Sequence, residues 1–198
     1  MNIREPFRCM EARTKGFSLV EVLVAVALLS FGLLGMMGLQ ASALKFTRDA
    51  RLQAVAVGFG RELGEMMHAN VAVAAQPENP YLGVFSGDPL MPERASNCLN
   101  SGNACASPID VAHAQMSDWL ARVGAALPGA QVTVCADDDP YDAHGLPVWN
   151  CAAPPPAAAR GAIYIKIGWT RANAQGKLVT SPDDAARPLV VFPVVLNA

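Results

Sequence analysis

The stretch RTKGFSLVEVLVAVALL, residues 13–29, places one carboxylate, Glu21, inside an apolar run. An ionised carboxylate at the centre of a bilayer costs about 2.5–3.5 kcal/mol on insertion scales. A segment that only anchored the chain would not need this charge. The chemistry open to Glu21 is pairing with a cation in the same apolar surroundings, because an unpaired buried charge is costly. Glu21 is therefore the first candidate functional residue.

The cysteines are the second group that could do chemistry. Cys9 lies near the N-terminus, and the other four are Cys98, Cys105, Cys135 and Cys151. Four cysteines in an oxidising compartment predict two disulfides, for which three pairings are possible. We favour Cys98–Cys105 and Cys135–Cys151 because each bond closes a short loop rich in turn-forming residues. Zinc binding is the alternative, but no Cys-x-x-Cys spacing favours it.

An acidic stretch, DDDPYDAHG at 137–145, could bind a cation. It lacks the Asp-x-Asp-x-Asp-Gly spacing of a calcium loop. A solvated turn without a metal is therefore the better interpretation. Were calcium bound, Asp137, Asp139 and Asp142 would be the first candidate ligands.

Enzymatic chemistry has little support in the sequence. His68, His113 and His144 are scattered without a nucleophile–base signature, and no phosphate-binding glycine loop occurs. A Ser–His–Asp triad is spatial, so the sequence leaves it open without favouring it. We predict no enzyme, no catalytic residue and no cofactor. A formal net charge of −2 also gives no basic field for nucleic acid.

The element that must carry Glu21 is an N-terminal helix. Residues 22–39 contain no charge and would form a helix of about 27 Å, close to the ~30 Å hydrocarbon core of a bilayer. Arg and Lys residues precede this span and no cluster is expected close behind it, which favours a cytoplasmic N-terminus and an exported body. A secretory signal would have a shorter apolar run followed by a small-residue cleavage site, whereas Gly16 precedes the run. A plain signal anchor leaves Glu21 unexplained.

The stretch KGFSLVEVLVAVALLSFGLLG resembles the class III signal and first helix of type IV pilins and pseudopilins. Gly16, Phe17 and Glu21 match the family pattern, and Ser18 stands where Thr is commoner. The resemblance implies cleavage between Gly16 and Phe17 by a prepilin peptidase, followed by N-methylation of Phe17. In a filament, the α-amine of a neighbouring subunit's Phe17 would then pair with Glu21. Such a pair would fix axial register, because any other offset leaves two charges unpaired.

We expect four segments along the chain: a leader peptide at 1–16, a transmembrane and assembly helix at 17–39, an amphipathic continuation at 40–75, and a periplasmic head at 76–198. The continuation is predicted because apolar residues recur at three- and four-residue steps. These residues are Leu52, Val55, Phe59, Leu63 and Met66.

Within the head, a long loop at 76–107 is followed by a helix that Ser107 caps and Pro128 ends. The buried face of that helix is expected to contain Ile109, Ala112, Met116, Trp119, Leu120 and Val123. Alternating residues predict strands at 131–135 and 162–169, and a third strand at 189–196 is expected at an edge because of Pro193. The expected fold is α+β and pilin-like, with a long N-terminal helix packed on a small antiparallel meander.

Among pilins, the chain is most similar to minor pilins of the PilV (type IV pilus modification protein) kind. The supporting features are the N-terminal motif, the paired-cysteine loop, the helix DWLARVGAALPG and the late strand ending in IGWT. The resemblance implies an inner-membrane subunit that joins a type IV pilus and helps to prime its assembly at the tip. Implied partners are other pilins and minor pilins, prepilin peptidase, the inner-membrane assembly machinery and membrane lipid. A type II secretion pseudopilin, or a periplasmic binding protein with a simple anchor, are the alternatives.

Overall fold

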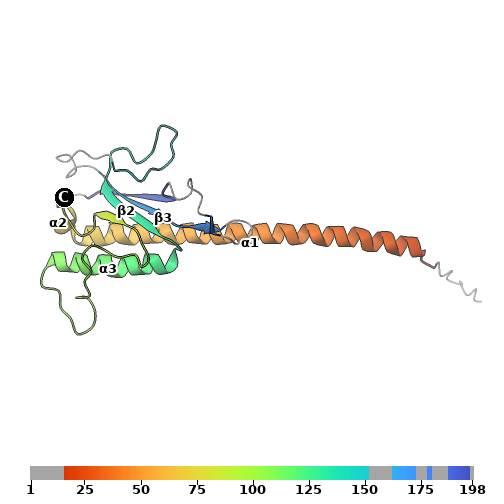
Figure 1. Ribbon diagram of the computed structural model, residues 1–198, viewed down its shortest axis with the longest axis horizontal. Coiled ribbons are helices and arrows are strands. Elements are labelled where there is room, and N and C mark those ends of the chain that lie inside the picture. Colours follow the sequence, from red (N-terminus) through yellow and green to blue (C-terminus); the bar gives the residue numbers. More distant parts are fainter. Residues whose placement is uncertain (1–15, 152–161, 173–177, 180–186, 197–198) are drawn as a thin grey trace, which may run out of the picture. The chain divides into compact units, whose positions relative to one another are not determined.

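The computed structural model describes residues 16–151, 162–172, 178–179 and 187–196. The chain divides into two compact units, Met1–Leu44 and Lys45–Ala198. Helix α1, Leu19–Ala69, contains the boundary between them (Figure 1). The fold is α+β, as expected, with a long apolar N-terminal helix and a small antiparallel sheet.

In the first unit, the described side chains are exposed on every side of the helix. This part of α1 includes a window with a mean hydropathy of 2.4, none of it buried, and is long and apolar enough to cross a membrane. A helix that is hydrophobic all round is normally buried in a protein core or in a membrane. Its surface therefore requires cover from lipid or from other protein.

Helix α1 is shorter than expected at both ends. It starts at Leu19 rather than residue 17, and it stops at Ala69 before a separate turn of helix, α2 (Val71–Ala74), so one unbroken helix to residue 75 was wrong. Asn70 lies between them with φ −125° and ψ 46°, outside the helical region. Its amide donates to the Pro108 carbonyl at 2.9 Å and to the Tyr81 hydroxyl at 3.3 Å, which holds the chain in this bend.

Helix α3 (Pro108–Ala126) forms where the sequence predicts a helix. The Ser107 hydroxyl accepts a hydrogen bond from the Asp110 amide at 3.2 Å, so the cap is the expected one. The predicted buried face is confirmed except at Ile109, which is 37% exposed. Ile109 lies in the first turn, at the rim of a pocket that Pro92 and His113 also line.

The main sheet has the order β1-β2-β3-β6, with every neighbouring pair antiparallel. Its strands are β1 (Gly83–Phe85), β2 (Gln131–Ala136), β3 (Ile163–Gly168) and β6 (Val190–Val194). Strands β4 (Arg171–Ala172) and β5 (Leu178–Val179) form a separate pair. Strand β6 contains Pro193 and is at the sheet edge, as predicted. Strand β1 lies in the segment predicted to be only loop.

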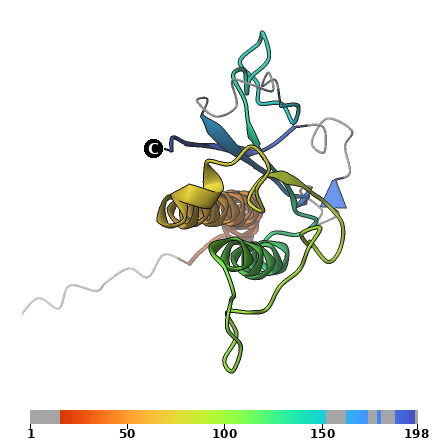
Figure 2. The same ribbon diagram turned by 90° about the vertical axis from the view of Figure 1, so that its left-hand side faces the viewer.

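In the second unit, α3 lies alongside the final part of α1, and the sheet packs against this helical layer (Figures 1 and 2). Leu63, Met67, Trp119 and Ile165 are among the fully buried core side chains. The sheet approaches α1 closely where α1 has a glycine. A Cβ atom at Gly60 would lie 3.0 Å from the Cβ atom of Phe192 on β6. Gly60 thus allows the helix and the sheet edge to touch.

Candidate assembly site

The residues that form the candidate assembly site lie at the start of α1. The Ser18 carbonyl accepts hydrogen bonds from the amides of Glu21 (3.0 Å) and Val22 (3.3 Å), so the helix begins directly after Ser18. Gly16 and Phe17 precede the helix, and Phe17 is 82% exposed. A cut between Gly16 and Phe17 would therefore fall in non-helical backbone, which suits entry into a peptidase.

Glu21 lies in the first turn of α1. A carboxylate there is favoured by the partial positive charge at the N-terminus of a helix. Glu21 lies about 6 Å along the helix from Phe17, at 1.5 Å per residue. No hydrogen bond or ion pair joins its carboxylate to another side chain in the part of the chain that the structure describes. Pairing of Glu21 with a cation, as the sequence predicts, would require a group outside these residues.

Both disulfides lie in the second unit and have the pairing that the short loops favour. Cys98 is joined to Cys105 with their Cα atoms 4.9 Å apart, and Cys135 to Cys151 with 6.2 Å. The first bond closes the loop before α3. The Ser96 amide next to it donates to the Ser117 hydroxyl on α3 at 2.8 Å.

The second disulfide lies beside a buried ion pair. Lys166, in the central strand β3, donates from Nζ to the Asp137 carboxylate and, at 2.7 Å, to the Asn150 carbonyl. The side chains of Lys166 and Asp137 are both 0% exposed. Because Asn150 is adjacent to Cys151, the disulfide to Cys135 helps to hold this carbonyl over the lysine.

The acidic stretch is only in part the solvated turn that the sequence favoured, because Asp138, Asp139 and His144 are exposed whereas Asp137 is buried. Asp137 is buried with Lys166, and Asp142 pairs with Arg187 at 2.6 Å. Backbone amides of Leu146 and His144 also donate to Asp142, at 3.0 and 2.9 Å. The Leu146 hydrogen bond, with further help from Arg187, lowers the pKa of Asp142 below its usual range. Within the described ranges, no group of three or more His, Cys, Asp or Glu side chains could hold a metal.

The histidines do not supply catalytic geometry either. Across the described residues, the side chains of His68, His113 and His144 make no hydrogen bond, so no nucleophile–base pair occurs there. His113 lines a pocket of about 540 Å³ with Glu93 and Arg94, without such a partner.

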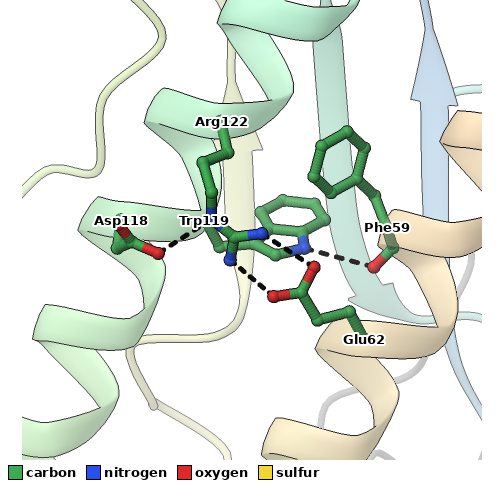
Figure 3. Close-up of polar contacts among 5 residues, drawn as sticks. All are labelled: Phe59, Glu62, Asp118, Trp119 and Arg122. Carbon is green, nitrogen blue, oxygen red and sulfur yellow. Dashed lines mark hydrogen bonds and ion pairs between the residues drawn. The ribbon is translucent and has the colours of Figure 1, made fainter.

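A contact that the sequence did not reveal joins the final part of α1 to α3 (Figure 3). Arg122 holds both carboxylate oxygens of Glu62, at 2.9 and 2.5 Å, and also Asp118 at 2.8 Å. Glu62 is the first cause of the raised pKa of Arg122. The indole of Trp119 donates to the Phe59 carbonyl at 3.1 Å, and the two rings meet edge to face. These contacts fix α3 against the final part of α1.

Cations also follow the apolar span, contrary to expectation. Lys45, Arg48 and Arg51 are all exposed on α1. The positive-inside rule compares the number of Lys and Arg residues on the two sides of a membrane span. The difference in positive charge between the two sides is therefore smaller than the basic leader alone suggests.

Comparison with protein families identifies the N-terminal motif. Residues 12–37 match the family described as "Prokaryotic N-terminal methylation motif". Comparison with curated proteins gives no match, and neither does comparison with solved structures. The matched range includes Gly16, Phe17 and Glu21 and the first turns of α1. The N-terminal segment is thus a type IV pilin-like prepilin signal, which supports placing the chain in the pilin and pseudopilin superfamily.

Proposed function

We propose that this protein is a minor pilin of a type IV pilus, of the PilV kind. The observation that carries the proposal is the apolar start of α1, whose side chains are exposed, with Glu21 in its first turn and within a methylation motif. Prepilin peptidase cuts between Gly16 and Phe17, and Phe17 is then methylated. Before assembly the chain spans the inner membrane, with its N-terminus in the cytoplasm and its head in the periplasm.

Assembly uses the surface that α1 exposes. When subunits pack into a fibre, their apolar helices exchange lipid for one another, and Glu21 enters a drier environment. The α-amine of a neighbour's Phe17 stays cationic when methylated and supplies the missing counter-charge. Because an unpaired charge is costly in low dielectric, the pair selects one axial offset between subunits.

The head determines where the subunit fits. The contacts of Arg122 and Trp119 hold α3 on the final part of α1, so these two helices form one continuous surface of the head. We propose that head surfaces select neighbouring minor pilins in a tip complex that primes assembly. The protein acts by binding and has no catalytic role. Twitching motility and adhesion would depend on it through the pilus.

The test is Glu21→Ala, with Glu65→Ala as the matched control. Glu65 is an exposed carboxylate further along the same helix. We expect Glu21→Ala to abolish surface piliation while the membrane level of the subunit stays normal, and Glu65→Ala to leave both unchanged. Normal piliation in Glu21→Ala would contradict the proposal.

The methylation motif is shared with pseudopilins, so a minor pseudopilin of a type II secretion system is the second candidate. Complementation separates the two functions. Restoration of pili in a strain that lacks this subunit supports the minor pilin, whereas restoration of protein secretion alone supports the pseudopilin. A periplasmic binding protein with a simple anchor would show no cleavage at Gly16.

A further inference from the structure

Three cations near the start of the second unit have no ion-pair partner among the residues that the structure describes. Lys45, Arg48 and Arg51 follow one another at three-residue intervals on α1, and all are exposed. Among the described residues, none of them forms an ion pair or side-chain hydrogen bond. By contrast, Arg122 and Lys166 each hold a carboxylate. We name Lys45, Arg48 and Arg51 the cationic cluster.

The cluster comes directly after the apolar span. Residues 22–44 carry no charge, and Leu44 and Phe46 beside the cluster are 73% and 72% exposed. Helices that lie in a membrane interface typically combine Leu and Phe on one side with Lys and Arg on the other. The exposed Leu44 and Phe46 next to the cationic cluster match this composition. An ordinary solvated face would not need the apolar side chains.

Helix length places Lys45 and Arg48 near headgroup level, with Arg51 about 4.5 Å further along the helix. At 1.5 Å per residue, Lys45 lies about 36 Å along a helix from Glu21, and Arg48 about 40 Å. A bilayer is about 30 Å thick in its hydrocarbon core and about 40–45 Å with both headgroup layers. We place Glu21 at one boundary of the hydrocarbon core and tilt the helix by about 20°, the average for membrane helices. The long side chains of Lys45 and Arg48 then reach the lipid phosphates of the opposite leaflet when they extend back along the helix.

We propose that the cationic cluster binds the phosphate groups of anionic phospholipids in the periplasmic leaflet of the inner membrane. This inference rests on the proposed function, because the chain must span that membrane. A guanidinium can hold two phosphate oxygens at once, and an ammonium adds a point charge. Asp49 is the nearby acid and is half-buried, so the exposed charge of the region stays positive. Binding retains unassembled subunits at a fixed depth, and entry into the fibre must break these contacts.

The experiment uses the full chain in nanodiscs of phosphatidylcholine that contain phosphatidylglycerol. Electron paramagnetic resonance of spin-labelled lipids measures the relative association of the two lipids with the protein. The native chain should select phosphatidylglycerol, and the triple variant Lys45→Gln, Arg48→Gln, Arg51→Gln should lose that selection. Each Lys or Arg near an anionic surface contributes ~1 kcal/mol, which corresponds to at most about fivefold per cation. High salt should reduce the difference.

Two further variants serve as controls. The triple variant Arg61→Gln, Arg94→Gln, Arg171→Gln removes the same charge from exposed cations elsewhere and should keep native selectivity. Charge-conserving exchange of the cluster (Lys45→Arg, Arg48→Lys, Arg51→Lys) should also keep it. The basic leader is present in every variant, so its contribution cancels.

Several results would overturn the inference. One is equal selection of phosphatidylglycerol by the native chain and by the triple variant of the cationic cluster. Another is a loss of selection in the variant of Arg61, Arg94 and Arg171 that equals the loss in the cluster variant. A cluster variant that fails in pilus assembly but keeps native lipid selection would assign the cations to acidic neighbours in the fibre. The assay requires insertion but not assembly, so lipid selection without piliation would refute only the proposed function. Resistance to alkaline extraction reports insertion, and a chain that is extracted would refute both.

Discussion

The buried pair of Lys166 and Asp137 gives the sharpest prediction for the head. Neither side chain is exposed. The Asn150 carbonyl also accepts a hydrogen bond from Lys166, and the Asp139 amide donates one to the Asp137 carboxylate. Breaking a buried pair by removing one partner typically costs 3–5 kcal/mol, because the remaining charge stays in low dielectric. Natural domains have only about 5–15 kcal/mol of stability. Asp137→Asn or Lys166→Met should therefore remove a large share of it.

The double variant measures the interaction itself. In Asp137→Asn with Lys166→Met no isolated charge remains, so its free energy of unfolding should fall by clearly less than the sum of the two single losses. Replacing a whole buried pair by neutral groups is often close to neutral. The decrease in the double variant should be smaller than the sum of the two single decreases by about 0.5–3 kcal/mol or more, as is typical of residues in one network.

The assay is urea unfolding of the full chain in detergent, followed by tryptophan fluorescence. Trp119 is fully buried, so its emission reports unfolding of the head. Asp139→Asn is the matched control, because Asp139 is an exposed carboxylate in the same turn. Two results would refute the interpretation of Lys166 and Asp137 as a stabilising unit. One is a decrease of less than about 1 kcal/mol in the free energy of unfolding of each single variant. The other is a decrease in the double variant that equals the sum of the two single decreases.

Two other changes test the packing and the electrostatics of the head. The Gly60→Ala variant should be about 1–3 kcal/mol less stable than Gly58→Ala, because the new methyl group would overpack against Phe192, whereas Gly58 faces open space. Urea unfolding of both variants measures this difference. Equal stabilities would contradict the prediction. Asp142 has a lowered pKa in the folded state, so its contribution is present above the ordinary Asp pKa and is lost as the pH falls through the lowered value. Asp142→Asn, which weakens the contact with Arg187, should therefore be less stable than the native chain near pH 7, and this gap should narrow as the pH falls below the ordinary Asp pKa. A gap that widens on acidification would show that the sign is wrong.

Local patterns in the sequence predicted much of the fold because they act within one element. The apolar run of α1, the Ser107 cap of α3 and the alternation in β3 each depend on near neighbours in the chain. The end of α1 was misplaced because Asn70 is held by Tyr81, which follows it in the chain. Strand β1 was missed because it has only three residues, and β2, its partner, comes much later.

The polar sites were harder to predict because their partners are distant in the chain. Lys166 lies in a strand that alternation predicts, but its partners Asp137 and Asn150 come from a segment earlier in the chain. A lysine between isoleucines was the signal available, and it could not identify the partner. Likewise, Glu62 and Arg122 meet only because α3 folds back on α1. The N-terminal motif needed no such contact, since Gly16, Phe17 and Glu21 are defined by spacing alone.

The proposed assembly through Glu21 depends on a free amine at Phe17. Mass spectrometry of the N-terminal peptide from protein isolated from its native host tests this most directly. We predict a chain that begins with N-methylated Phe17, with the segment before it removed. A peptide that still contains Gly16 joined to Phe17 throughout the assembled and membrane pools would contradict the account, because no amine would then be available to meet Glu21.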